Sequence, residues 1–127
     1  MSKILLIEDD EVMSTIVKRI LLKAEYQVDH VRNGKEAFEI LETSGYGFDL
    51  IITDIMMPYA NGFEILSRVR NLPDGRQIPV ILLSNAGNEE MVKEGLELGA
   101  NDFLKKPVLP AELLSRIRRV LTGNPAK

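Results

Sequence analysis

Five short apolar runs, separated by stretches of helical periodicity, constrain the fold more than any other feature of this 127-residue sequence. The runs are Ile4–Ile7, Val28–Val31, Leu50–Ile52, Val80–Leu83 and Phe103–Leu104. The first, third and fourth are apolar throughout, as in strands that are covered on both faces. The second run includes a charged aspartate, which is typical of an edge strand.

Helical stripes alternate with these runs. They cover residues 13–24, 37–41, 63–70, about 88–98 and 110–121, with apolar side chains three and four residues apart. Gly99 is a suitable C-cap for the fourth stripe, and Pro110 is a good first-turn residue for the fifth. A strand–helix unit repeated five times predicts an α/β domain with a parallel sheet and helices on both faces.

Length and composition exclude several classes of protein and site. The length fits one domain, with an expected core over residues 3–122 and a short tail over 123–127. There is no Cys and one His, which excludes disulfides, thiol nucleophiles and Cys- or His-rich metal sites. A net charge of −3 does not favour the binding of nucleic acid by the domain as a whole. Because no apolar run approaches the ~20 residues of a membrane span, we expect a cytoplasmic protein with no membrane partner.

Charged and hydroxyl side chains follow four of the five predicted strands. In chain order they are Glu8, Asp9 and Asp10, then Asp54, then Ser84 and Asn85, then Lys105 and Lys106. Because ligands of open parallel sheets bind beyond the carboxyl ends of the strands, we expect these side chains to share one site. Carboxylates in that number suit Mg²⁺, and a carboxylate can attack phosphorus to give an acyl phosphate. Lysine and serine can then contact the phosphoryl oxygens.

Each acid taken singly has a simpler explanation. Acids after strands commonly cap the following helix, and Asp10 suits that role. The combination of acids with a Lys-Pro pair and a hydroxyl residue at neighbouring strand ends favours a phosphoryl site over solvated loop acids.

Four motifs in chain order carry a resemblance to a known family. They are ILLIEDD from residue 4, TDIMMP from residue 53 with Gly62 after it, IPVILLS from residue 78, and GANDFLKKP from residue 99. Through them the chain resembles, from Lys3 to about Thr122, the receiver domain of bacterial two-component response regulators. The resemblance implies a flavodoxin-like (βα)5 fold, with a five-stranded parallel sheet of order 2-1-3-4-5.

The resemblance also implies roles for the acids. Asp54 would be the phosphoacceptor. Asp9 would bind Mg²⁺ directly and Glu8 through water, with Asp54 and the backbone carbonyl of Met56 as further ligands; Mn²⁺ is an acceptable substitute. The phosphoryl donor would be a phosphohistidine on a sensor histidine kinase or a phosphotransfer protein.

Further implied roles belong to residues that respond to the phosphoryl group. Lys106, before a cis peptide bond to Pro107, would pair with that group, and Ser84 would close over one of its oxygens. Phe103 would rotate inward behind them. Asn85 stands where a small Ala or Gly is more usual, so we expect it to modulate access of water or donor to the acceptor.

The implied function is a phosphorylation switch rather than an enzyme with turnover. Its output surface would comprise the fourth helix, the fifth strand and the fifth helix, and it would bind a downstream effector or a second copy of the chain. Candidate residues on that surface are Val92, Leu96, Glu112, Leu114 and Arg116.

Two other readings of the same fold remain open. A pseudo-receiver would bind proteins without phosphorylation, and Asn85 is the only residue that favours it. An enzyme is disfavoured, because the acids of residues 8–10 are contiguous rather than Asp-x-Asp, and neither a Walker loop nor Gly-x-Gly-x-x-Gly occurs.

Overall fold

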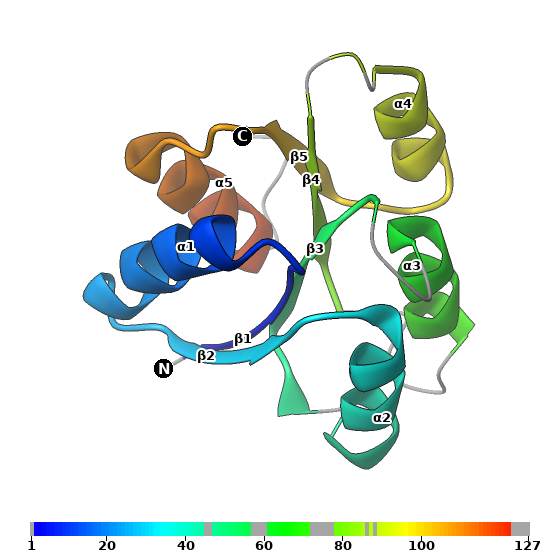
Figure 1. Ribbon diagram of the computed structural model, residues 1–127, viewed down its shortest axis with the longest axis horizontal. Coiled ribbons are helices and arrows are strands. Elements are labelled where there is room, and N and C mark those ends of the chain that lie inside the picture. Colours follow the sequence, from blue (N-terminus) through cyan, green and yellow to red (C-terminus); the bar gives the residue numbers. More distant parts are fainter. Residues whose placement is uncertain are drawn as a thin grey trace.

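The computed structural model describes residues 2–44, 47–56, 61–71, 78–85, 87 and 89–122. The strands are β1 (Lys3–Ile7), β2 (Gln27–Val31), β3 (Leu50–Asp54), β4 (Val80–Ser84) and β5 (Asp102–Lys105). The helices are α1 (Glu11–Lys23), α2 (Gly34–Ser44), α3 (Gly62–Asn71), α4 (Glu89–Glu97) and α5 (Pro110–Thr122). The strands pair in parallel in the order β2-β1-β3-β4-β5, which confirms the expected topology and places β2 at an edge (Figure 1).

The central strands bury both of their faces. In β1, Ile4 and Leu6 belong to a core formed with α1 and α5, whereas Leu5 and Ile7 belong to a core formed with α2, α3 and α4. Figure 1 shows the same division, with α1 and α5 on one side of the sheet and the other three helices opposite. Burial on both faces explains why the runs in β1, β3 and β4 are apolar throughout.

The strand register brings the polar residues together at one edge of the sheet. Ile7 pairs with Val31 on β2 and with Thr53 on β3, so Glu8 and Asp54 follow at neighbouring positions. On the other side, Ser84 on β4 pairs with Lys105 on β5. The carboxyl ends of β1, β3, β4 and β5 therefore meet at one place.

The first helix begins where Asp10 caps it. Its carboxylate accepts a hydrogen bond from the Met13 amide at 2.8 Å, so this acid has the capping role that its position suggested. The fourth helix is shorter than expected, spanning Glu89–Glu97, and Asn88 lies outside the described residues. Gly99 follows it with a φ of 117°, a conformation that favours glycine.

The prediction that Val92 lies on an exposed face of α4 was wrong. Val92 is 6% exposed and belongs to the core, whereas Leu96 is exposed. A side chain at position 95 would collide with Leu82, so Gly95 lets α4 approach the sheet closely. That approach draws Val92, one turn earlier on the same helix, into the core.

Part of one predicted motif and the predicted tail lie outside the described residues. These are Met57 and Pro58 after β3, and the tail over residues 123–127. Among the residues that are described, no helix is long and apolar enough to cross a membrane.

Gly62 provides a test of how tightly α3 packs against the end of β3. A Cβ atom there would lie 2.7 Å from the backbone oxygen of Asp54, whereas one at Gly47 would meet nothing within 4 Å. We expect Gly62→Ala to lower the free energy of unfolding by about 1–3 kcal/mol, because backbone atoms must shift to admit the methyl group. Gly47→Ala is the matched control and should change it little. Denaturant midpoints give the measurement, and equal midpoints for the two variants would contradict the close packing.

Candidate functional site

A cleft of about 590 Å³ opens at the carboxyl edge of the sheet. It is lined by the last residue of β3, Asp54, and by side chains from the connections that follow β1, β3, β4 and β5, among them Asp9, Met56, Asn85 and Lys106. The sequence had assigned each of these residues to the site, and the structure brings them together. Met13, on the first turn of α1, also lines the cleft and was not predicted.

Three carboxylates converge in this part of the molecule. Glu8, Asp9 and Asp54 each place a carboxylate oxygen within 4.8 Å of the other two. Glu8 is fully buried and Asp54 is 5% exposed, whereas Asp9 is open to solvent. Two of the three carboxylates, those of Glu8 and Asp54, are therefore buried, and that of Asp9 is accessible to solvent.

Lys106 neutralises part of this charge. Its Nζ donates to Oδ2 of Asp54 at 2.8 Å and lies 3.1 Å from Oε1 of Glu8. The Lys106–Pro107 peptide bond is cis, as the family resemblance implied. Burial acts to lower the pKa of Lys106, but the hydrogen bond to Asp54 and the two nearby carboxylates outweigh it and raise that pKa. The ammonium group therefore stays charged between the two acids.

The ionised form of Glu8 is costly despite this pairing. Burial, reinforced by the negative charge of Asp54, raises the pKa of Glu8 from 4.5 to about 7. The hydrogen bond from the Asp10 amide to Oε2, at 3.0 Å, and the charge of Lys106 oppose this rise. Glu8 is therefore the acid that has most to gain from another cation nearby.

The donor set fits a hard divalent cation. With all three carboxylates ionised and Lys106 charged, the cluster carries a net charge of −2, which a divalent cation would balance. Oxygen ligands with one or two carboxylates suit Mg²⁺, which retains several of its waters. Asp9 and Asp54 line the cleft together with Met56.

Ser84 and Phe103, like the buried Glu8, were predicted for the site but do not line the open cleft. Ser84 is 1% exposed, and its hydroxyl oxygen has no hydrogen-bond partner among the described residues. Phe103 is half-buried and lines a different groove, beside Val92 and Leu96 of α4. The sequence located both correctly on β4 and β5, but it gave no indication of which way their side chains point.

β2 contacts the main chain of the acidic loop, which comprises Glu8, Asp9 and Asp10 between β1 and α1. The sequence did not reveal this role. The Glu8 amide donates to the carbonyl of Val31 at 3.1 Å, and Nε2 of His30 lies 2.9 Å from the carbonyl of Glu8. His30 is therefore engaged with the backbone of the site. A single His in the predicted strand beside the acids was the only available signal.

Comparison with known proteins decides the family. Residues 4–118 match the response regulator receiver domain family. The chain belongs to this family.

Relatives of this receiver domain support the assignment. SilR of Salmonella typhimurium is 42% identical over 123 residues, which cover 96% of this chain and 52% of SilR. The signal receiver domain of a signal transduction histidine kinase from Syntrophus aciditrophicus superposes with a TM-score of 0.87 at 39% identity, covering 98% of this chain and 92% of that structure. The receiver domain thus spans about half the length of SilR and nearly all of the solved receiver domain from Syntrophus aciditrophicus.

A third relative was solved with a metal. The receiver domain of a sensor histidine kinase from Pseudomonas aeruginosa, with a magnesium ion coordinated in its active site cleft, superposes with a TM-score of 0.85 at 31% identity. The match covers 95% of this chain and 98% of that one.

The residues predicted for the output surface of this receiver domain do not all lie together. Leu96 is exposed on α4, beside Phe103, but Leu114 lines a groove between α1 and α5. Arg116 pairs with Asp102 of β5 at 2.6 Å, and Glu112 lies 3.7 Å from the same guanidinium.

The arginines of α5 are partly neutralised by β5. Asp102 also pairs with Arg119, at 2.9 Å, so a single β5 carboxylate holds two arginines of α5. Sequence periodicity placed these cations on α5, but it could not show that a residue of β5 lies between them.

The raised pKa of Glu8 predicts how pH changes the stability of the metal-free protein. Between pH 4.5 and about 7, the folded state binds more protons than the unfolded state, so stability falls as pH rises through this window. Glu8→Gln, which resembles the neutral acid, should be more stable than the parent at pH 8, by up to about 3 kcal/mol, and not at pH 4.

Urea unfolding in EDTA at the two pH values measures this difference. Glu39→Gln, on the exposed face of α2, is the matched control and should change stability little at either pH. A Glu8→Gln protein that is no more stable than the parent at pH 8 would contradict the electrostatic account of the cluster.

Proposed function

We propose that this receiver domain is a phosphorylation switch whose acceptor is Asp54 and whose phosphoryl transfer depends on Mg²⁺. The observation that carries the proposal is the hydrogen bond between Lys106 and Asp54, made beside two further carboxylates in an open cleft. If the ion pair between Lys106 and Asp54 served only to stabilise the fold, a further exposed carboxylate beside it, that of Asp9, would have no role.

The chemistry proposed for Asp54 is a single group transfer. One of its carboxylate oxygens attacks the phosphorus of a phosphohistidine on a sensor histidine kinase or phosphotransfer protein. The new P–O bond forms as the P–N bond breaks, and the electron pair of that bond returns to the imidazole. The products are an aspartyl phosphate and a neutral histidine, so the domain is an acceptor rather than an enzyme with turnover.

The residues around Asp54 have complementary tasks. Asp9 and Asp54 would hold Mg²⁺ directly, with the Met56 carbonyl as a third protein ligand and Glu8 acting through water. When bound, the metal neutralises charge on the transferring phosphoryl oxygens. Lys106, already 2.8 Å from Asp54, would hold the same charge after transfer.

The switch proposed here begins at Ser84 and Phe103. Ser84 has a buried hydroxyl without a partner in the described part of the chain, and a phosphoryl oxygen on Asp54 would supply one. Phe103 lies between the core and the groove beside α4, so an inward rotation would alter the surface around Leu96. A downstream effector or a second copy of the chain would read that surface.

The mass of the intact protein tests the acceptor. After incubation with acetyl phosphate and Mg²⁺, we expect one phosphoryl adduct, absent when EDTA replaces the metal and absent in Asp54→Asn. An adduct that persists in Asp54→Asn would place the acceptor elsewhere. No adduct on the parent, together with no binding of beryllofluoride, would favour the pseudo-receiver that binds proteins without phosphorylation.

The side chain of Asn85 provides a second prediction. It is exposed and lines the cleft beside Asp54 and Lys106, so it restricts the approach of water to the acceptor. Asn85→Ala should therefore shorten the half-life of the aspartyl phosphate several-fold. The rate of loss of the adduct, measured by intact mass after removal of acetyl phosphate, gives the comparison. An unchanged or longer half-life would show that Asn85 does not shield the site.

A further inference from the structure

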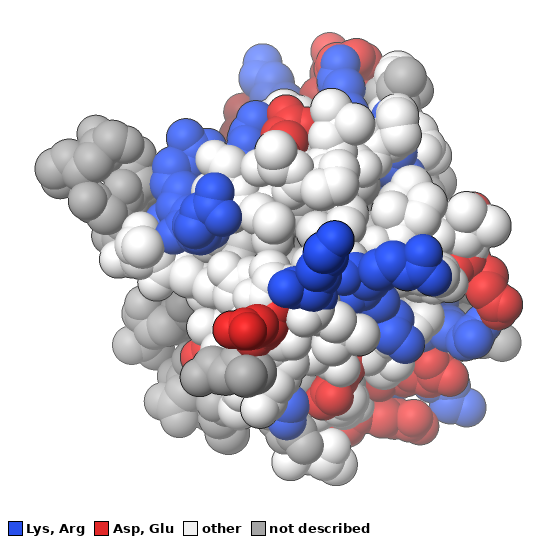
Figure 2. Space-filling view, turned by 90° about the vertical axis from the view of Figure 1, so that its left-hand side faces the viewer, with Lys and Arg blue, Asp and Glu red and all other residues white. Residues whose placement is uncertain are grey.

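A groove of about 780 Å³ lies between α1 and β2, outside the acidic cleft. Its charged lining residues are Glu11, Lys18, Arg19, Lys23 and Arg32, and we call it the basic groove. Figure 2, which views the side of the molecule formed by α1 and α5, shows Lys and Arg side chains gathered across the middle of this face. The protein as a whole has a net charge of −3, so this concentration of cations runs against its composition.

The carboxylate in the groove is already engaged. Oε2 of Glu11 lies 3.2 Å from the guanidinium of Arg32. Lys18, Arg19 and Lys23 form no ion pair with any carboxylate in the described ranges of the chain. Asp29, the acid of the neighbouring strand, is paired with Lys3 on the adjacent β1. Three cations on α1 therefore lack a counter-charge.

The sequence of α1 also offers these cations no acidic residue close enough along the helix to form an ion pair. Positions three and four residues away from Lys18, Arg19 and Lys23 hold no Asp or Glu. Arg19 and Lys23 are themselves four residues apart, and like charges at this spacing destabilise a helix slightly. Arg19 and Lys23 therefore form a positive pair on one side of α1, suited to a negative charge from outside.

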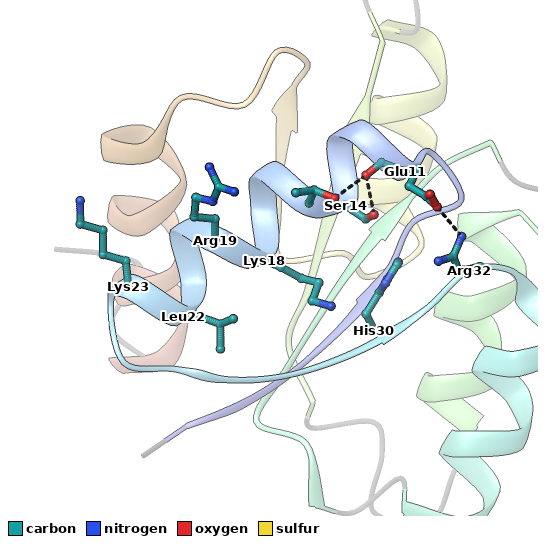
Figure 3. Close-up of a pocket in the computed structure, with 9 residues that line it drawn as sticks. Glu11, Ser14, Lys18, Arg19, Leu22, Lys23, His30 and Arg32 are labelled. Atoms are coloured by element: carbon teal, nitrogen blue, oxygen red, sulfur yellow. Dashed lines mark hydrogen bonds and ion pairs between the residues drawn. The ribbon is translucent and has the colours of Figure 1, made fainter.

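The arrangement of the groove is extended rather than compact. Figure 3 shows Lys18 reaching from α1 toward His30 on β2, with Arg32 at the Glu11 end, whereas Arg19 and Lys23 extend from α1 on the side away from β2. Arg19 and Lys23 also line the groove between α1 and α5. The 13 residues of α1 give the groove a length of roughly 20 Å. Leu22, an exposed apolar residue, also lines it.

The groove is poorly suited to a single phosphate ion. The hydroxyls of Ser14 and Thr15 both donate to the carbonyl of Glu11, at 3.0 and 2.8 Å, so they are not free to donate to an anion. One ring nitrogen of His30 already contacts the carbonyl of Glu8. The donors that remain are long, flexible side chains spread along the helix.

We propose that the basic groove binds an extended acidic segment of a partner protein. Carboxylates of such a segment, laid across α1, would meet Lys18 on the side that faces β2 and Arg19 and Lys23 on the other side. An apolar side chain of the segment would cover Leu22. A nucleic acid fits less well, because among the described residues no ring besides the imidazole of His30 lines the groove, so bases would have no aromatic platform for stacking.

A binding experiment on the full chain tests this proposal. The probe is a fluorescein-labelled hexaglutamate peptide, and its anisotropy is measured in about 20 mM salt, where exposed charges are weakly screened. The groove variant is Lys18→Glu/Arg19→Glu/Lys23→Glu. The control is Lys35→Glu/Lys93→Glu/Arg118→Glu, which reverses three cations that also lack ion pairs in the described part of the structure and gives the same net charge.

The expected result is at least a tenfold loss of affinity in the groove variant and less than a threefold loss in the control. Amide chemical-shift changes on addition of the peptide should map to α1 and β2. Labelling by acetyl phosphate should be the same in both variants, which would show that each folds and that the groove is separate from the phosphoryl site. Equal losses in the two variants, shifts elsewhere, no binding to the parent, or tighter binding of an oligothymidylate than of the peptide would each overturn the proposal.

Discussion

The ammonium group of Lys106, held between Asp54 and Glu8, is the interaction on which the site depends. It allows two nearly buried carboxylates to lie beside each other at the end of the sheet, where they would otherwise repel one another. Burying a charge pair is costly unless its geometry is good, and removing one partner leaves an uncompensated buried charge. Even with Lys106 charged, the three carboxylates of the cluster leave surplus negative charge, which a divalent cation would balance.

The rest of the fold serves to place these three side chains. Parallel pairing of β1, β3, β4 and β5 brings their carboxyl ends to one edge, and helices on both faces bury the strands that lead there. The acidic loop is fixed at its backbone by β2, through Val31 and His30. In β1, β3 and β4 the interior of each strand is uncharged, so the sheet carries the charges of the site at its edge and not in its core.

Sequence alone predicted the sheet, its edge strand and most of the cleft, because hydrophobic periodicity and the position of polar residues after strands are both local signals. It failed where the outcome depends on contacts between elements. Val92 is buried because Gly95 lets α4 approach Leu82, and Arg116 is paired because Asp102 reaches it from β5. The degree to which burial perturbs Glu8, and the direction in which Ser84 points, likewise depend on packing around them rather than on spacing along the chain.

The pKa of Glu8, measured directly, tests the central claim that this cluster holds surplus negative charge for a cation. Carbon-13 NMR titration of the Glu8 side-chain carboxyl, with Glu8→Gln used to assign the signal, should give an apparent pKa near 7 in EDTA. Saturating Mg²⁺ should lower that pKa, because a nearby cation favours the ionised form. A pKa near 4.5 without metal, or one that Mg²⁺ leaves unchanged, would contradict the account.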